Sequence, residues 1–169
     1  VSLGDRPSDF YTPNFISLDP PEHDGQRMAV TGVVAPTNLA ALETVIRERA
    51  AKILDGLPVG ETFNWVDKVS IELTTQMLAA IFDFPFEERR KLTYWSDLAT
   101  STVATGGSMP EESRREGLME CLEVFTQLKR ERESRDPAKH NDLVTMMAHS
   151  PATKDMDPME YLGNLILLI

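Results

Sequence analysis

Apolar residues recur at helical spacing along most of the chain. Between residues 38 and 55 they form one stripe, and the opposite face is charged. The stripe consists of Leu39, Leu42, Ile46, Ala50, Ile53 and Leu54. Between residues 65 and 83 apolar residues cover more than one face, which is typical of a helix buried in a bundle. The pattern predicts two long helices, which end at Gly56 and before Pro85.

Four later segments have the same periodicity or their own start signals. Pro110 precedes Glu111 and Glu112, which suit the positive end of a helix dipole. Either Asn141 or Asp142 can cap a short helix, and Asp157-Pro158-Met159-Glu160 is a further start signal. The predicted helices cover residues 86–102, 110–135, 141–149 and 158–169. The sequence therefore predicts an all-α fold with about six to seven helices.

Another start signal lies near the N-terminus, after a loop expected at residues 1–18. Asp19 is a suitable N-cap, Pro20 suits the first helical position, and Glu22 can reach back to the cap. These residues predict a helix over 19–35.

Two basic residues lie one turn apart on this predicted helix. His23 and Arg27 are four residues apart, so they share a helical face and can both donate to the same anion. The spacing predicts a face that can hold a pair of carboxylates. The alternative is a solvated histidine beside an arginine that pairs with a neighbouring acidic residue.

Composition limits the class of protein. A chain of 169 residues with 41% hydrophobic content can form one domain with a core. The net charge of −10 argues against a nucleic-acid surface, which needs clustered cations. No window has the length of uninterrupted apolar residues that a membrane span needs, and the first residues do not resemble a signal peptide. We therefore expect a cytoplasmic segment without a membrane span.

The single cysteine excludes an internal disulfide and a multi-cysteine metal site. Cys121 shares a helical stripe with Leu118, Leu122, Phe125 and Leu128, so it is interpreted as a small apolar core residue.

Residues 15–27 contain the pattern D-P-P-x-H-x-x-x-R, from Asp19 to Arg27. This pattern resembles the third-helix motif of bacterial haem-thiolate monooxygenases, the cytochrome P-450 superfamily. The predicted helices resemble that family's helices C (19–35), D (38–55), E (65–83), F (86–102), G (110–135), H (141–149) and the start of I (158–169). Residues 69–79 and 90–97 resemble the branch that hydroxylates alkanes and fatty acids at the chain end.

The resemblance implies a function for the complete protein. His23 and Arg27 would bind the propionates of haem b, and residues 103–109 would be a lid loop between helices F and G. The implied partners are a ferredoxin, a ferredoxin reductase and an apolar small-molecule substrate. The implied substrate-channel residues are Phe15, Ile16, Leu92, Trp95, Leu98 and Leu165. The axial cysteine, the acid–threonine pair and the E-x-x-R helix are expected beyond Ile169, which makes the chain an internal fragment of one domain.

Two other classes of function remain as alternatives. An acidic helical module could bind a basic partner without catalysis. A small hydrolase would need a nucleophile and an orienting carboxylate beside His23, His140 or His149. The sequence has no serine in a nucleophile-elbow context, and no histidine pair has metal-ligand spacing. The ordered helical resemblance favours the monooxygenase.

Overall fold

The computed structural model describes residues 10–101 and 109–169. Within these ranges the regular structure is helical and no strand occurs, which confirms the predicted all-α class. The seven α-helices are α1 (Glu22–Thr31), α2 (Pro36–Asp55), α3 (Glu72–Phe82), α4 (Arg90–Thr100), α5 (Glu111–Arg132), α6 (Leu143–His149) and α7 (Pro158–Leu168). Short 3-10 turns occur at Phe15–Ser17, Gly32–Val34 and Phe86–Glu88, and a π-helical turn at Val66–Ile71 leads into α3.

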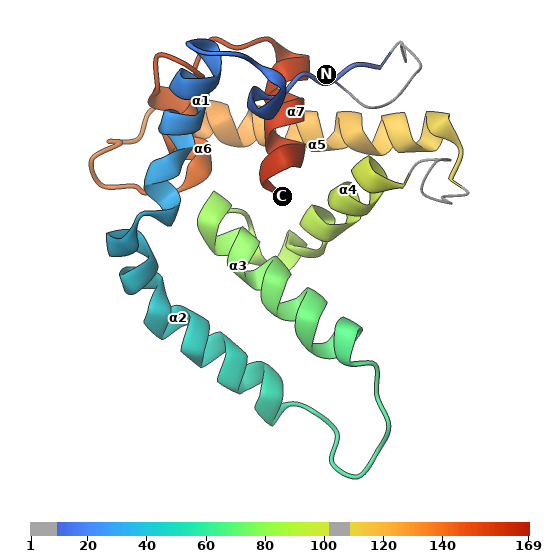
Figure 1. The fold of residues 1–169 in the computed structure, drawn as a ribbon. Helices are drawn as coiled ribbons and strands as arrows, with labels where there is room; N and C mark the ends of the chain where they lie inside the picture. The colour runs from blue at the N-terminus through green and yellow to red at the C-terminus, as the bar shows by residue number, and fades with distance from the viewer. Residues whose placement is uncertain (1–9, 102–108) are drawn as a thin grey trace.

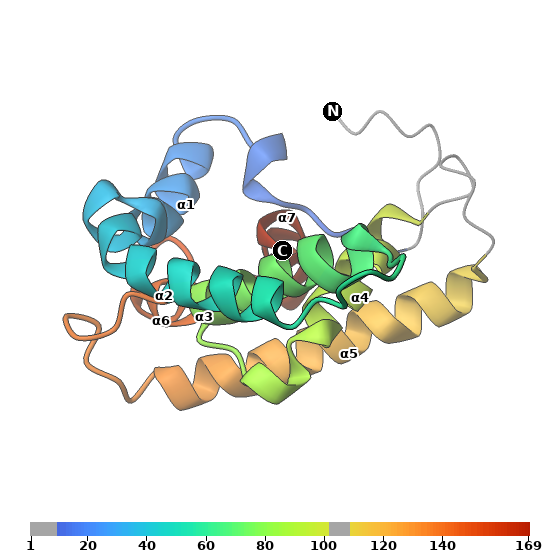
Figure 2. The same ribbon diagram turned by 90° about the horizontal axis from the view of Figure 1, so that it is seen from below.

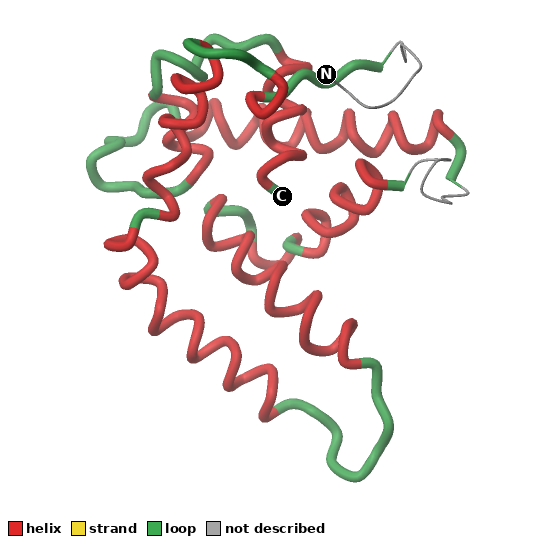
Figure 3. The backbone as a smooth tube through the Cα atoms, in the orientation of Figure 1, coloured by secondary structure: helices red, strands yellow, loops and turns green. Residues whose placement is uncertain are grey.

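The helices form a packed group from which one pair extends. The long helix α5 packs against α4, α6 and α7, and α1 packs against α6 (Figure 1). Helices α2 and α3 lie side by side and reach away from this group, joined by a long loop (Figures 1 and 3). Seen from below, α7 lies between the segment that precedes α1 and the long α5 (Figure 2). Helix α7 also contacts α4, and Leu167 and Leu168 at its C-terminal end line a cavity together with residues of α1 and α3.

The core is centred on four aromatic rings from three segments. Phe125 of α5 packs against Phe82, Phe84 and Trp95 at centroid distances of 5.3, 5.5 and 5.9 Å. All four side chains are almost completely buried. Burying a large apolar side chain stabilises a fold by about 1.5–3 kcal/mol, so this cluster holds α3, α4 and α5 together.

The ends of the helices differ in part from the predictions. Helix α1 begins at Glu22, and its cap residue Pro21 has no side-chain acceptor. Asp19 contributes its main-chain carbonyl, which accepts from the His23 N–H at 3.1 Å, and no side chain caps the start of α1, so the predicted side-chain cap at Asp19 is wrong. Residues 32–34 form a 3-10 turn, and the helix predicted over 19–35 is shorter than expected.

The two later start signals act through side chains. The Asp142 carboxylate, and not Asn141, accepts from the Thr145 N–H at 2.8 Å at the start of α6. The Asp157 carboxylate accepts from the Met159 N–H at 2.8 Å at the start of α7. Most of the expected lid loop at 103–109 lies outside the described residues.

Among the described residues, no single helix is long and apolar enough to cross a membrane. One pair of helical segments, Glu22–Val34 and Pro36–Asp55, meets the length and composition test jointly, with a 42° bend between them.

Candidate functional site

The His23 imidazole is held by the main chain of the segment before α1. Its Nδ1 atom lies 2.7 Å from the Phe15 carbonyl oxygen, and the two rings meet edge to face at 6.1 Å. A carbonyl oxygen only accepts, so Nδ1 carries the proton and donates it. The other ring nitrogen, Nε2, is therefore the one available to a ligand.

Arg27 lies one turn further along the same helix. Its side chain is exposed, and it forms no hydrogen bond or ion pair with any residue in ranges 10–101 and 109–169. The predicted helical face is thus formed, and the alternative in which Arg27 pairs with a neighbouring acid is not observed in the described chain. A guanidinium without a carboxylate partner is available to a bound anion.

Arg27 stands at the edge of an apolar cavity of about 400 Å³ between α1, α3, α6 and α7. Its walls are Phe15, Ile16, Val30, Val33, Val34, Leu78, Ile81, Leu143, Leu167 and Leu168. Thr31, the other polar residue of the lining, donates its hydroxyl to the Arg27 carbonyl at 2.7 Å. Arg27 is therefore the cationic group of an otherwise apolar cavity.

This donor set fits haem. Ligand pockets are mostly apolar, with a few polar groups that fix orientation. Haem is flat and apolar except for two carboxylates at one edge, which suit the apolar walls and Arg27; His23 does not line the cavity and lies one turn away on α1. The residues present can hold that edge of the cofactor.

Similar proteins were found over nearly the whole chain. Cytochrome P-450 119 of Sulfolobus acidocaldarius is 27% identical over 154 residues, 91% of this chain and 38% of that protein. The solved structure of cytochrome P-450-153 from Novosphingobium aromaticivorans matches 98% of this chain and 41% of its own, with a TM-score of 0.84 and 42% identity. CYP153D17 from Sphingomonas sp. PAMC 26605 matches 99% of this chain and 41% of its own, with a TM-score of 0.81 and 44% identity.

These homologues and solved structures strongly support the cytochrome P-450 superfamily for this chain. It spans about two fifths of the length of these relatives, 38–41%. No family model matches the chain. The similarity to these cytochrome P-450 proteins implies haem as the cofactor.

The structure separates the predicted channel residues into two groups. Phe15 and Ile16 line the apolar cavity beside Arg27. The other four, Leu92, Trp95, Leu98 and Leu165, are at most 1% exposed and do not line this cavity. Their role in the described structure is core packing, and contact with a substrate stays a prediction.

Cys121 is completely buried in the core. Burial, with a smaller effect of Glu120, raises the pKa of its thiol far above the usual range, which opposes the thiolate form that a haem iron needs. This agrees with the interpretation of Cys121 as a core residue. No cluster of three or more His, Cys, Asp or Glu that could hold a metal occurs in the described part of the chain.

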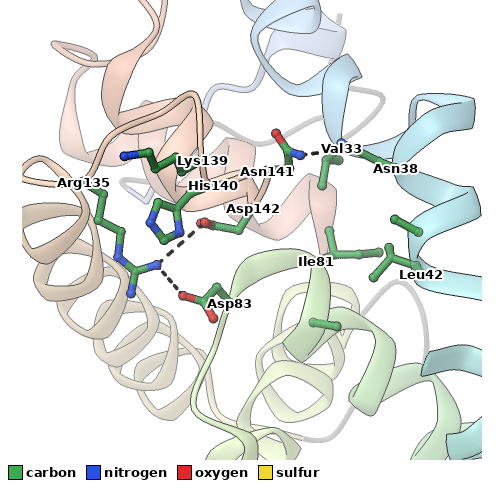
Figure 4. A pocket seen from close by; sticks show the side chains of 12 residues that line it. Val33, Asn38, Leu42, Ile81, Asp83, Arg135, Lys139, His140, Asn141 and Asp142 are labelled. Carbon is green, nitrogen blue, oxygen red and sulfur yellow. Dashed lines mark hydrogen bonds and ion pairs between the residues drawn. The ribbon is translucent and has the colours of Figure 1, made fainter. Parts of the chain in front are cut away.

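A second cavity, of about 480 Å³, lies between α2, the end of α3 and the loop that joins α5 to α6 (Figure 4). Arg135 pairs there with Asp83 at 2.7 Å and reaches Asp142 at 4.0 Å. The two cavities share Val33 and Ile81 as lining residues. Because Arg135 already meets two carboxylates, its role here is to hold the loop on α3.

Sequence reasoning missed a buried polar network beside the site. Asn164 of α7 is 1% exposed and joins the Phe15 main chain to Gln26 and, through it, to Glu160. The helical pattern places Asn164 on the buried face of α7, and a polar residue on such a face was the available signal.

Proposed function

We propose that the full-length protein is a haem-thiolate monooxygenase that inserts one oxygen atom from dioxygen into a terminal C–H bond of an alkane or fatty acid. The observation that carries the proposal is the apolar cavity with Arg27 at its edge and His23 one turn away. Haem bound there would supply the activation of dioxygen. Electrons would come from a ferredoxin and its reductase.

The residues of this chain would bind and orient the cofactor. Arg27 would hold one carboxylate through its guanidinium, and His23 would donate from Nε2 to the other when both ring nitrogens are protonated. Val30, Leu167 and Leu168 would exclude water from the apolar part of the cofactor. Two ionic contacts, from Arg27 and from protonated His23, would also fix how the cofactor is oriented.

The terminal-hydroxylase branch is supported by two kinds of likeness. Residues 69–79 and 90–97 resemble that branch, and the two CYP153-type structures share 42% and 44% identity with the chain. An apolar site holds a hydrocarbon by burial alone, at about 0.8 kcal/mol per CH₂. The alkyl chain of either proposed substrate therefore needs no charged group to hold it.

The test uses the full-length protein. Replacing both basic residues, His23→Leu and Arg27→Leu, should lower haem occupancy per protein, measured from the absorbance of the haem band against total protein. Arg47→Leu is the matched control, because Arg47 is an exposed arginine that pairs with Glu43 at 2.8 Å on the surface of α2. Unchanged occupancy in the double variant would remove the carboxylate assignment. Hydroxylation products of octane and a fatty acid, assayed with a ferredoxin and its reductase, would test the substrate class.

A further inference from the structure

Gly163 and Asn164 of α7 contact the segment that precedes α1. The Asn164 side chain accepts from the Phe15 N–H at 2.8 Å and donates to the Gln26 side chain at 2.9 Å. Gln26 donates in turn to the Glu160 carboxylate at 2.6 Å. Asn164 therefore has partners for both its acceptor and its donor, as a buried polar group requires.

Gly163 brings the main chain of this segment directly onto the helix. A Cβ atom at Gly163 would overlap the Pro13 carbonyl oxygen and lie 2.8 Å from the Thr12 oxygen. These are main-chain atoms, so a side chain at this position would push the whole segment away from α7. The segment lies above α7 in Figure 2, where the two elements are adjacent.

Phe15 links α7 to His23 of the basic pair. Its N–H is held by Asn164, and its carbonyl holds Nδ1 of His23 at 2.7 Å. The geometry points to Asn164 and Gly163 as positioning residues: they fix Phe15 on α7, so that the Phe15 carbonyl fixes the His23 ring with Nε2 available to a cofactor carboxylate. This inference rests on the proposed function. It adds α7 as the helix that positions His23.

The expected change in the rate of haem release follows from the loss of the hydrogen bond between His23 and the Phe15 carbonyl. Moving Phe15 away removes the acceptor of Nδ1 and lets the imidazole rotate. A single hydrogen bond changes an equilibrium by about twofold to tenfold, so haem release should accelerate by a factor in that range. Asn164 and Gly163 do not line the cavity, but Phe15 does, so the His23→Leu background separates an effect through His23 from a change in the cavity wall.

The experiment measures the rate of haem release from the full-length ferric protein to an excess of apomyoglobin. Asn164→Leu and Gly163→Ala are each made in the natural and in the His23→Leu background. Both should accelerate release about twofold to tenfold in the natural background and have little further effect once His23 is replaced. Tyr161→Phe is the matched control: it removes another buried bond of α7, from the Tyr161 hydroxyl to the Phe125 carbonyl, and should leave release unchanged.

Hydrogen exchange of the Phe15 amide gives a readout that does not depend on haem. Asn164→Leu should speed this exchange, and unchanged protection would overturn the inference. Equal acceleration of haem release in both backgrounds would also overturn it, because that result indicates general loosening. If His23→Leu alone leaves release unchanged, the carboxylate role of His23 in the proposed function fails instead. Gly163→Ala removes no side chain of the hydrogen-bond network, so it carries the test if Asn164→Leu does not fold.

Discussion

The contact between α4 and α5 permits a sharp test of whether Leu98 is a core or a channel residue. Gly117 of α5 is buried, and a Cβ atom there would overlap Cδ1 of Leu98 and lie 3.3 Å from the Tyr94 hydroxyl oxygen. Leu98 is only 1% exposed, so its side chain has little room to turn away. Gly117→Ala should therefore lower the free energy of unfolding by about 1–3 kcal/mol, the usual cost of overpacking.

The reciprocal change should relieve the overlap. Leu98→Ala alone leaves a cavity and should cost about 2–5 kcal/mol. The added methyl group of Gly117→Ala has space in that cavity, so the double variant should be more stable than the sum of the two losses by at least about 1 kcal/mol.

Urea unfolding of the full-length protein, followed by circular dichroism, measures the four members of this cycle. Met119→Ala on the exposed side of α5 is the control and should change the free energy of unfolding by no more than about 0.5 kcal/mol, since Met119 is 42% exposed. Additive losses for Gly117 and Leu98 would refute the reasoning. A shift in the chain length of the hydroxylated products in Leu98→Phe, without loss of stability, would instead make Leu98 a channel residue.

Two further predictions concern Glu72 and Cys121, whose pKa values are shifted by their surroundings. Burial by itself would raise the pKa of Glu72, but hydrogen bonds from Gln76 and Arg89 and the charges of Arg89 and Arg90 outweigh it and lower the pKa. The contribution of ionised Glu72 to stability should therefore be fully present at neutral pH and disappear as pH falls through the lowered pKa. The difference in urea stability between the natural protein and Glu72→Gln should vanish in acid. A difference that grows in acid would contradict this reasoning. Because burial raises the pKa of the Cys121 thiol, Cys121 should resist a thiol reagent at pH 8 in the native protein and react only once the protein is unfolded. Rapid labelling of Cys121 itself in the native state would show an accessible thiolate.

The sequence by itself determined the features that depend on neighbouring residues. Helical class follows from apolar spacing. The start signals at Asn141 or Asp142 and at Asp157 were recognisable because a capping side chain accepts from an N–H within three residues. The face shared by His23 and Arg27 is also a local property, fixed by the helical repeat.

Only the tertiary structure decided what those faces meet. Asp19 is a good cap by residue type, yet Pro21 occupies the cap position of α1. The bond between Phe15 and Asn164 joins residues 149 positions apart, and it holds the carbonyl that orients His23. No local pattern encodes such a pair, because its formation depends on how α1 and α7 pack around a common core. The packing of α4 on α5 placed Leu98 against Gly117, where helical spacing could say only that Leu98 faces inward.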